Sequence, residues 1–192
     1  LLACSISLSQ TTFPVNGVHD EKTELYALTH ATVFVDYKTS ISDATVIVRK
    51  GKIENVGQNI SIPQGAVVVD CKGKFIYPSF IDLYSNYGMP KVEPKNNPPG
   101  EQYLSSKSGA YDWNEAIHPE ISAQQNFSVN EDRANDLRKL GFGSVVTHQQ
   151  DGIMRGTGAF VLLSDKNTND VFVNGNAANF LSFNKGTSTQ DY

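Results

Sequence analysis

The sequence has few cysteines, no cluster of basic residues and no hydrophobic run long enough to cross a membrane. Its two cysteines are Cys4 and Cys71, and no histidine stands at ligand spacing from Cys71, so we expect Cys71 to be a partly buried spectator. A membrane helix needs about 20 apolar residues, so no transmembrane helix is predicted. The 16 basic and 20 acidic residues give a net charge of −4, which argues against a nucleic-acid partner.

The chain nevertheless contains enough apolar material for a packed core. Hydrophobic residues make up 39% of its 192 residues and charged residues 19%, a balance that argues against global disorder. Fifteen glycines and eight prolines favour a loop-rich chain over a helical bundle. A complete (β/α)8 barrel takes about 250 residues, so a whole barrel with an accessory domain does not fit.

The amino terminus is typical of an export signal. Residues 1–9 are interpreted as a signal-peptide remnant, because Ser7-Leu8-Ser9 is a small-x-small site that predicts cleavage before Gln10. A lipoprotein signal that ends at Cys4 and a plain amino-terminal strand are the alternatives. Export to the periplasm, the outer membrane or the medium is therefore expected. Cleavage would leave Cys71 as a lone thiol without an internal disulfide partner, and residues 10–24 are predicted to be an extended lead-in.

Residues 25–77 are predicted to form a β-rich accessory domain. Short runs rich in Val, Ile, Thr and Phe predict its strands, and these runs are residues 31–36, 44–49, 52–56 and 66–70. Lys50-Gly51 is typical of a hairpin turn, and Pro63-Gln64-Gly65 predicts another turn. Closely spaced strands of this kind favour a small antiparallel sheet or half-sandwich.

The second half of the chain predicts an α/β arrangement. Residues 79–84 are nearly continuous apolar sequence, which predicts a strand buried on both faces. Asn130 caps a predicted helix over residues 131–140, and a strand over 143–147 completes a parallel βαβ unit. Two further short strands are predicted at 158–163 and 170–173, followed by a tail from Asn174 without regular structure.

A series of motifs between residues 44 and 86 resembles the amino-terminal signature of the metal-dependent amidohydrolase superfamily, of the imidazolonepropionase and dihydroorotase type. The matching residues, in order, are Gly51-Lys52-Ile53, Val56-Gly57, Pro63-Gln64-Gly65-Ala66, Asp70 with Gly73-Lys74, and Pro78 to Asn86. The resemblance implies a β-rich accessory domain over 25–77, followed over 78–192 by the first part of an incomplete (β/α)8 TIM barrel.

The metal-binding part of that signature is replaced. The family has an H-x-H pair at the end of the first barrel strand, where zinc or a similar divalent metal is expected in an intact member. Here the matching positions are Tyr84 and Asn86, and a phenol or a neutral amide is a poor zinc ligand. We therefore expect no metal bound by this chain, with Tyr84 and Asn86 as polar groups at the barrel mouth that contact substrate. Asp82 is expected to make a structural hydrogen bond.

Two further residues are candidates for chemistry. His148 follows the predicted strand 143–147, and the carboxyl ends of barrel strands face the active site, so His148 is the candidate catalytic residue, against a hydrogen-bonded loop histidine as the alternative. Arg155 lies in a glycine-containing segment, Asp151 to Gly158, that we expect to be a loop. It is a candidate for binding an anionic substrate. His118 is expected to be structural.

Two functional hypotheses remain open. In the first, the chain is the amino-terminal part of an exported hydrolase that acts on C–N bonds of amides or dipeptides, and it is inactive alone because the remainder of the parent polypeptide, its main partner, supplies the metal ligands. In the second, it is a non-catalytic module that binds a ligand or partner through the barrel mouth and the aromatic segment 103–127. Alone, the chain is expected to expose strand edges that favour self-association.

Overall fold

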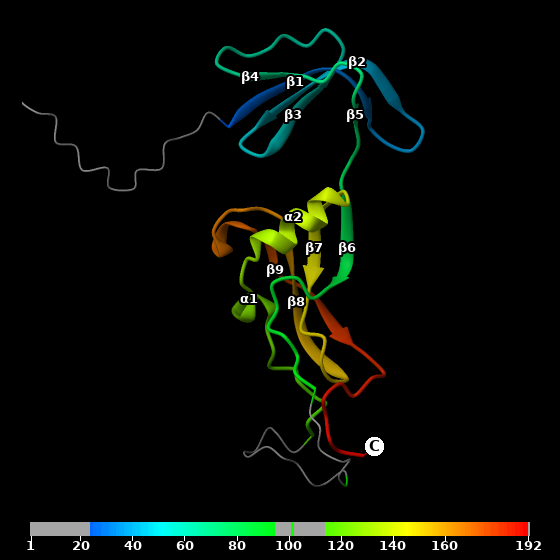
Figure 1. Cartoon of the computed structure of the whole chain (residues 1–192), viewed down its shortest axis with the longest axis vertical. Coiled ribbons are helices and arrows are strands. Elements are labelled where there is room, and N and C mark those ends of the chain that lie inside the picture. Colours follow the sequence, from blue (N-terminus) through cyan, green and yellow to red (C-terminus); the bar gives the residue numbers. More distant parts are fainter. Residues whose placement is uncertain (1–23, 95–100, 102–113, 192) are drawn as a thin grey trace, which may run out of the picture. The chain divides into compact units, whose positions relative to one another are not determined.

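The computed structural model describes residues 24–94, 101 and 114–191. The chain divides into two compact units, Leu1–Pro78 and Ser79–Tyr192, each with its own sheet (Figure 1). Both sheets are mixed, so the chain is mostly β with few helices. The expected signal remnant at 1–9, most of the lead-in at 10–24, and the aromatic residues Tyr103, Tyr111 and Trp113 lie outside the described residues.

The first unit is a five-stranded sheet in the order β3-β2-β1-β4, with β5 also paired to β1. Its strands are β1 (Leu25–Phe34), β2 (Ser40–Arg49), β3 (Lys52–Gly57), β4 (Val67–Asp70) and β5 (Phe75–Ile76). The three first strands are antiparallel neighbours, whereas β4 and β5 run parallel to β1. The prediction of a small antiparallel sheet or half-sandwich therefore holds only for β1, β2 and β3, because the chain crosses back after β3 and returns on the far side of β1.

Turn chemistry in this unit agrees with the sequence. Lys50 and Gly51 both have positive φ angles, of 50° and 72°, which match the right-handed twist of the hairpin between β2 and β3. The amide of Ala66 donates to the carbonyl of Pro63 at 3.2 Å and Gly65 has a φ of 82°, so this turn is confirmed. Cys71 is a free, buried thiol.

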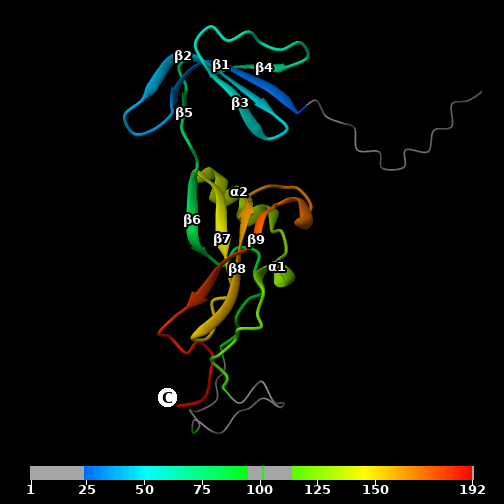
Figure 2. The same cartoon turned by 180° about the vertical axis from the view of Figure 1, so that it is seen from behind.

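The second unit is a four-stranded sheet in the order β6-β7-β8-β9 (Figure 2). Its elements are β6 (Phe80–Ser85), α1 (Ala123–Asn126), α2 (Glu131–Lys139), β7 (Phe142–Thr147), β8 (Met154–Leu162), the 3-10 turn η1 (Thr168–Asp170) and β9 (Phe172–Leu181). β6 and β7 are parallel, with α2 between them in sequence, so the predicted strand–helix–strand unit is present. The β7/β8 and β8/β9 pairs are antiparallel.

Four expectations for this unit need correction. No TIM-barrel portion is evident in the described residues, since the sheet turns antiparallel at β8, where a barrel would continue with parallel strands. β6 is not buried on both faces, because it ends the sheet order and leaves Phe80, Ile81 and Leu83 exposed. Arg155 lies in β8 rather than in a loop, and β9 continues through the tail that we expected to be irregular, because the two strands pair with each other.

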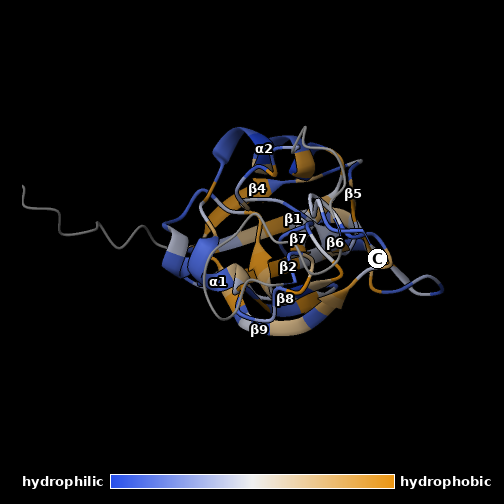
Figure 3. Ribbon diagram, turned by 90° about the horizontal axis from the view of Figure 1, so that it is seen from below, coloured by the Kyte–Doolittle hydropathy of each residue, from blue (hydrophilic) through white to orange (hydrophobic). Residues whose placement is uncertain are grey.

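The helix α2 forms where its capping residues predict it. The Asn130 side chain accepts a hydrogen bond from the backbone amide of Arg133 at 3.0 Å, which satisfies a donor left free at the helix start. Most of the helix is hydrophilic in Figure 3, while Ala134 and Leu137 contact the core of the unit. That core also contains Val145, Val161 and other apolar residues of the sheet. Among the described residues, no helix is long and apolar enough to span a membrane.

Candidate functional site

Three of the four predicted site residues lie together in the second unit. Tyr84 is in β6, His148 directly follows β7, and Arg155 is in β8. The Tyr84 and His148 rings meet edge to face, with centroids 4.7 Å apart. An Arg155 guanidinium nitrogen (Nη1) donates to the Tyr84 hydroxyl at 2.6 Å. Because β6 and β7 are parallel, residues 84 and 148 lie at the carboxyl ends of these two strands. The antiparallel strand β8 begins at the same end of the sheet, which brings Arg155 next to them.

His148 is fully buried, and neither of its ring nitrogens has a hydrogen-bond partner in the described structure. Its backbone amide donates to the carbonyl of Ser85 at 3.0 Å, which holds the residue against the end of β6. Burial, and then the positive charge of Arg155, lowers the pKa of His148 from 6.5 to about 4. The imidazole is therefore neutral near pH 7. Its predicted catalytic role remains a prediction, because no described group receives or supplies a proton at either nitrogen.

Phe180 of β9 lies against His148 and Tyr84, and the sequence did not indicate it as a site residue. Its ring stacks on the His148 imidazole, with centroids 3.6 Å apart and planes at 3°, and it lies 6.3 Å from the Tyr84 ring. Gly158 allows the close approach, because a Cβ atom there would lie 2.3 Å from the Phe180 ring. The Phe180-Leu181 pair within a polar tail is the sequence signal that could have indicated a strand there.

Arg155 is buried, with 5% of its surface exposed. Its Nε donates to the carbonyl of Gly152 at 2.9 Å, and Nη1 donates to Tyr84 as described above. Both acceptors are neutral, and no carboxylate pairs with Arg155 in the parts of the chain that the structure describes. We call the set formed by Tyr84, His148, Arg155 and Phe180 the Arg155 cluster.

Asn86 is the fourth predicted site residue, and its contact lies elsewhere. Its side-chain oxygen accepts a hydrogen bond from the Arg133 guanidinium of α2. Among the described residues, no hydrogen bond or ring contact joins it to His148 or Arg155. Asp82 accepts a hydrogen bond from the backbone amide of Tyr84 at 3.0 Å, so the expected structural role of this carboxylate is confirmed.

Residues 84 and 86 stand where the resembled family has its metal-binding histidines, and their contacts show whether a divalent metal would fit there. The oxygens of residues 84 and 86 each accept a hydrogen bond from a guanidinium. A cationic donor at each oxygen opposes the binding of a second cation, and neither a neutral amide nor a protonated phenol favours zinc. Within residues 24–94, 101 and 114–191, no group of three or more His, Cys, Asp or Glu side chains is placed to hold a metal. The residues present therefore do not fit a zinc ion.

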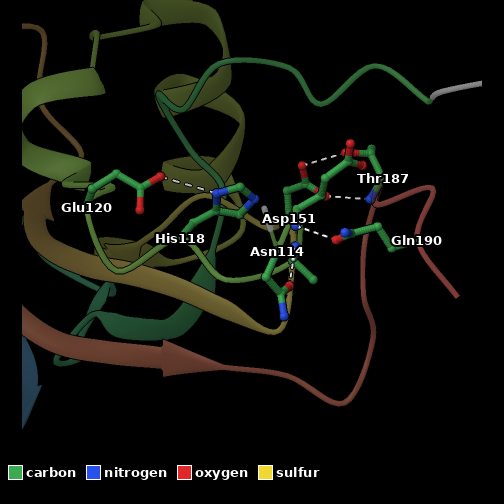
Figure 4. A network of polar contacts seen from close by, with 8 residues as sticks. Asn114, His118, Glu120, Asp151, Thr187 and Gln190 are labelled. Atoms are coloured by element: carbon green, nitrogen blue, oxygen red, sulfur yellow. Dashed lines mark hydrogen bonds and ion pairs between the residues drawn. The ribbon is translucent and has the colours of Figure 1, made fainter. Parts of the chain in front are cut away.

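A second polar network lies at the carboxyl end of the described chain (Figure 4). The carboxylate of Asp151 accepts from the backbone amide and the hydroxyl of Thr187, both at 2.7 Å. The Gln190 side chain accepts from the amide of Glu115 at 2.7 Å, and His118 pairs with Glu120 at 3.2 Å. The Asp151–Thr187 and Glu115–Gln190 bonds join segments distant in sequence and so hold the carboxyl end of the described chain in place. The structural role expected for His118 stays a prediction.

Comparisons with known proteins find similarity to a dihydroorotase and to an amidohydrolase. No family model matches the chain. A dihydroorotase of Methanosarcina mazei is 26% identical over 80 residues, which are 42% of this chain and 15% of that protein. An amidohydrolase from Thermotoga maritima shares the fold with a TM-score of 0.58 and 24% identity over 84% of this chain. A prolidase structure from Bifidobacterium longum has a TM-score of 0.32 and covers 35% of the chain, too little to support a conclusion.

The chain spans 15% of the dihydroorotase and 40% of the Thermotoga maritima amidohydrolase. The alignment with the dihydroorotase and the fold shared with the Thermotoga protein agree with the motifs found between residues 44 and 86. By sequence over 80 residues this chain is similar to a dihydroorotase, and it shares its fold with an amidohydrolase.

Proposed function

We propose that the chain is the amino-terminal part of an exported amidohydrolase-like protein that hydrolyses C–N bonds, and that this part holds no metal itself. The relationship to amidohydrolases and the 40% coverage of a structural relative support the first half of the proposal. One observation carries the second half. Arg155 and Arg133 donate to the oxygens at positions 84 and 86, where the family has its histidine pair.

In this proposal β6, α2 and β7 form a parallel strand–helix–strand unit, and the remainder of the polypeptide supplies the strands that carry the metal ligands. A metal held by those later strands would supply a hydroxide nucleophile. The residues of this chain would contribute binding and orientation. Arg155 and Tyr84 offer hydrogen-bond donors near the carboxyl ends of β6 and β7, beside the buried, neutral ring of His148.

The test is metal analysis and amide hydrolysis with the parent protein and with the 192-residue chain in parallel. We expect stoichiometric zinc and hydrolysis of a cyclic amide or a dipeptide in the parent, and both should be lost when histidines outside this chain are substituted. The 192-residue chain should retain no zinc and show no turnover. Zinc retained by the chain alone, or a parent without metal and without turnover, would contradict the proposal.

The second candidate is a non-catalytic binding module. The same arginine contacts favour it, because guanidinium groups at the positions of metal ligands suit recognition of an anion more than hydrolysis. A parent protein that binds an anionic ligand but neither holds metal nor hydrolyses amides would establish this alternative.

Export is part of the proposal and rests on the residues before position 10. Expression of the parent with its native amino terminus should yield a processed protein outside the cytoplasm. Amino-terminal sequencing should then begin at Gln10, whereas attachment of a labelled fatty acid at Cys4 would establish the lipoprotein alternative. An unprocessed cytoplasmic product would contradict export by either route.

A further inference from the structure

Arg155 carries a buried positive charge, and no carboxylate among the described residues pairs with it. Arg155 is 5% exposed, and its described hydrogen bonds go to a carbonyl and to a phenol. A buried guanidinium is costly unless it is paired, and proteins generally satisfy it with a carboxylate or a bound anion. The neighbouring His148 is neutral near pH 7, so it neither adds to nor balances this charge.

Two hydrogen-bond donors remain beside this charge. The Tyr84 hydroxyl accepts from Arg155, so its own proton is left for another acceptor, and no described residue takes it. Tyr84 as a whole is 56% exposed, whereas Arg155 is buried. The second terminal nitrogen of Arg155 (Nη2) has no hydrogen-bond partner among the described residues. Unlike the ring nitrogens of His148, it is not fully buried. The 2.6 Å bond between Tyr84 and Arg155 holds the phenol hydroxyl against the guanidinium that carries Nη2.

The charge and the shape of this donor pair select one class of ligand. A carboxylate carries a single negative charge, which balances one guanidinium, whereas a phosphate or sulfate dianion would leave an excess charge next to a buried ring. The two oxygens of a carboxylate also accept hydrogen bonds from two adjacent donors at once. A neutral amide offers one acceptor and no charge.

We propose that Arg155 and Tyr84 form a binding site for one carboxylate group. The carboxylate belongs to a small ligand or to an Asp or Glu side chain from the remainder of the parent polypeptide. Where the ligand is a substrate, the assignment rests on the proposed function and restricts the substrates to amides that bear a free carboxylate. Binding itself requires no hydrolysis, so it is measured separately.

The experiment is an acetate titration of the isotope-labelled 192-residue chain at pH 7 and constant ionic strength, followed by NMR of the Arg155 Nε–H signal. Acetate should shift this signal in a saturable manner, and acetamide should not. Tyr84→Phe keeps the aromatic ring and removes the donor, so affinity should fall about 5- to 10-fold. Arg155→Lys removes the planar fork and should abolish the saturable response, observed at the His148 ring. Arg49→Lys, at the exposed pair with Glu54, is the matched control and should bind normally.

The outcomes separate the alternatives. No saturable shift with acetate, equal shifts in wild type and Tyr84→Phe, or tighter binding of sulfate than of acetate would each overturn the proposal. If Arg155→Lys does not fold, the Tyr84→Phe comparison decides. If both the 192-residue chain and the parent protein bind acetate, the site takes a carboxylate from a free ligand. If only the 192-residue chain binds acetate, an Asp or Glu side chain of the parent already occupies the site there. A parent that hydrolyses amides while neither protein binds acetate would refute this site and leave the proposed function standing.

Discussion

The imidazole of His148 stacks on the ring of Phe180, with centroids 3.6 Å apart and planes at 3°. The two residues come from opposite sides of β8, since His148 follows β7 and Phe180 belongs to β9. Gly158 of β8 lies between them, because a Cβ atom there would contact both the Phe180 ring and the carbonyl of Thr147. The stack buries a polar ring whose two nitrogens have no described partner, and several predictions rest on this arrangement.

Replacing His148 by phenylalanine should stabilise the second unit. The buried imidazole without hydrogen-bond partners carries a desolvation penalty of about 1–3 kcal/mol, and phenylalanine keeps the stack on Phe180 without it. We expect the free energy of unfolding, measured by urea denaturation, to rise by about 1–3 kcal/mol. His30→Asn, at an exposed histidine with a positive φ of 58°, is the control and should change stability by less than about 1 kcal/mol. A loss of stability in His148→Phe would show that the nitrogens have a partner.

Stability should fall as the pH is lowered from about 6.5 toward 4. The folded-state pKa of His148 is lowered to about 4 from 6.5, by burial and then by Arg155, so in this range the unfolded chain binds a proton that the folded chain does not. The contribution of His148 is complete above pH 6.5 and lost as the pH falls to 4, by about 3 kcal/mol. Urea denaturation between pH 7 and pH 4 measures it.

The matched control for this pH dependence is His148→Phe. The variant should lose this part of the pH dependence and keep the part contributed by carboxylates such as Asp70, whose pKa is lowered by its hydrogen bond with His30. An identical slope between pH 6.5 and 4 in the variant and the wild type would contradict the assignment to His148.

Gly158→Ala should disrupt the stack. The added Cβ would lie 2.3 Å from the Phe180 ring and 3.0 Å from the Thr147 carbonyl, so the ring must move away from His148. Overpacking of this kind costs about 1–3 kcal/mol, measurable by urea denaturation together with the ring signals of Phe180 in NMR. Gly57→Ala, whose Cβ would meet Ile60 at an ordinary 3.5 Å, is the control and should unfold nearly as the wild type does.

Restoring the family's histidine pair should not restore a metal site. In the double variant Tyr84→His and Asn86→His, the positive charges of Arg155 and Arg133 remain next to the new imidazoles and oppose a dication. Elemental analysis after dialysis against zinc should find no bound metal in the variant or in the wild type. Stoichiometric zinc in the double variant would show that the arginines do not exclude it.

Helix α2 should depend on its cap. Asn130→Ala removes the hydrogen bond to the amide of Arg133 and should lower the free energy of unfolding by about 1 kcal/mol. Asn130→Ser retains a capping oxygen and should be nearly neutral. Equal losses in both variants would show that the cap bond contributes nothing and that position 130 matters for another reason.

The sequence by itself determined the local elements and indicated the resemblance to amidohydrolases. The turns at Lys50-Gly51 and at Pro63 to Gly65, and the helix capped by Asn130, follow from backbone preferences within a few residues, so they were predictable. The motifs up to Asn86 indicated the relationship, and the replacement of the histidine pair by Tyr84 and Asn86 was visible directly.

Only the tertiary structure decided how these elements pair and which side chains meet. Whether β4 and β8 run parallel or antiparallel to their neighbours depends on crossovers between distant segments, which local propensity does not encode. The contact of Tyr84 with Arg155, and the burial of His148 under Phe180, arise because residues far apart in sequence share one sheet edge. An apolar run such as Phe80 to Leu83 shows that a strand forms, but its exposure depends on what the fold places against it.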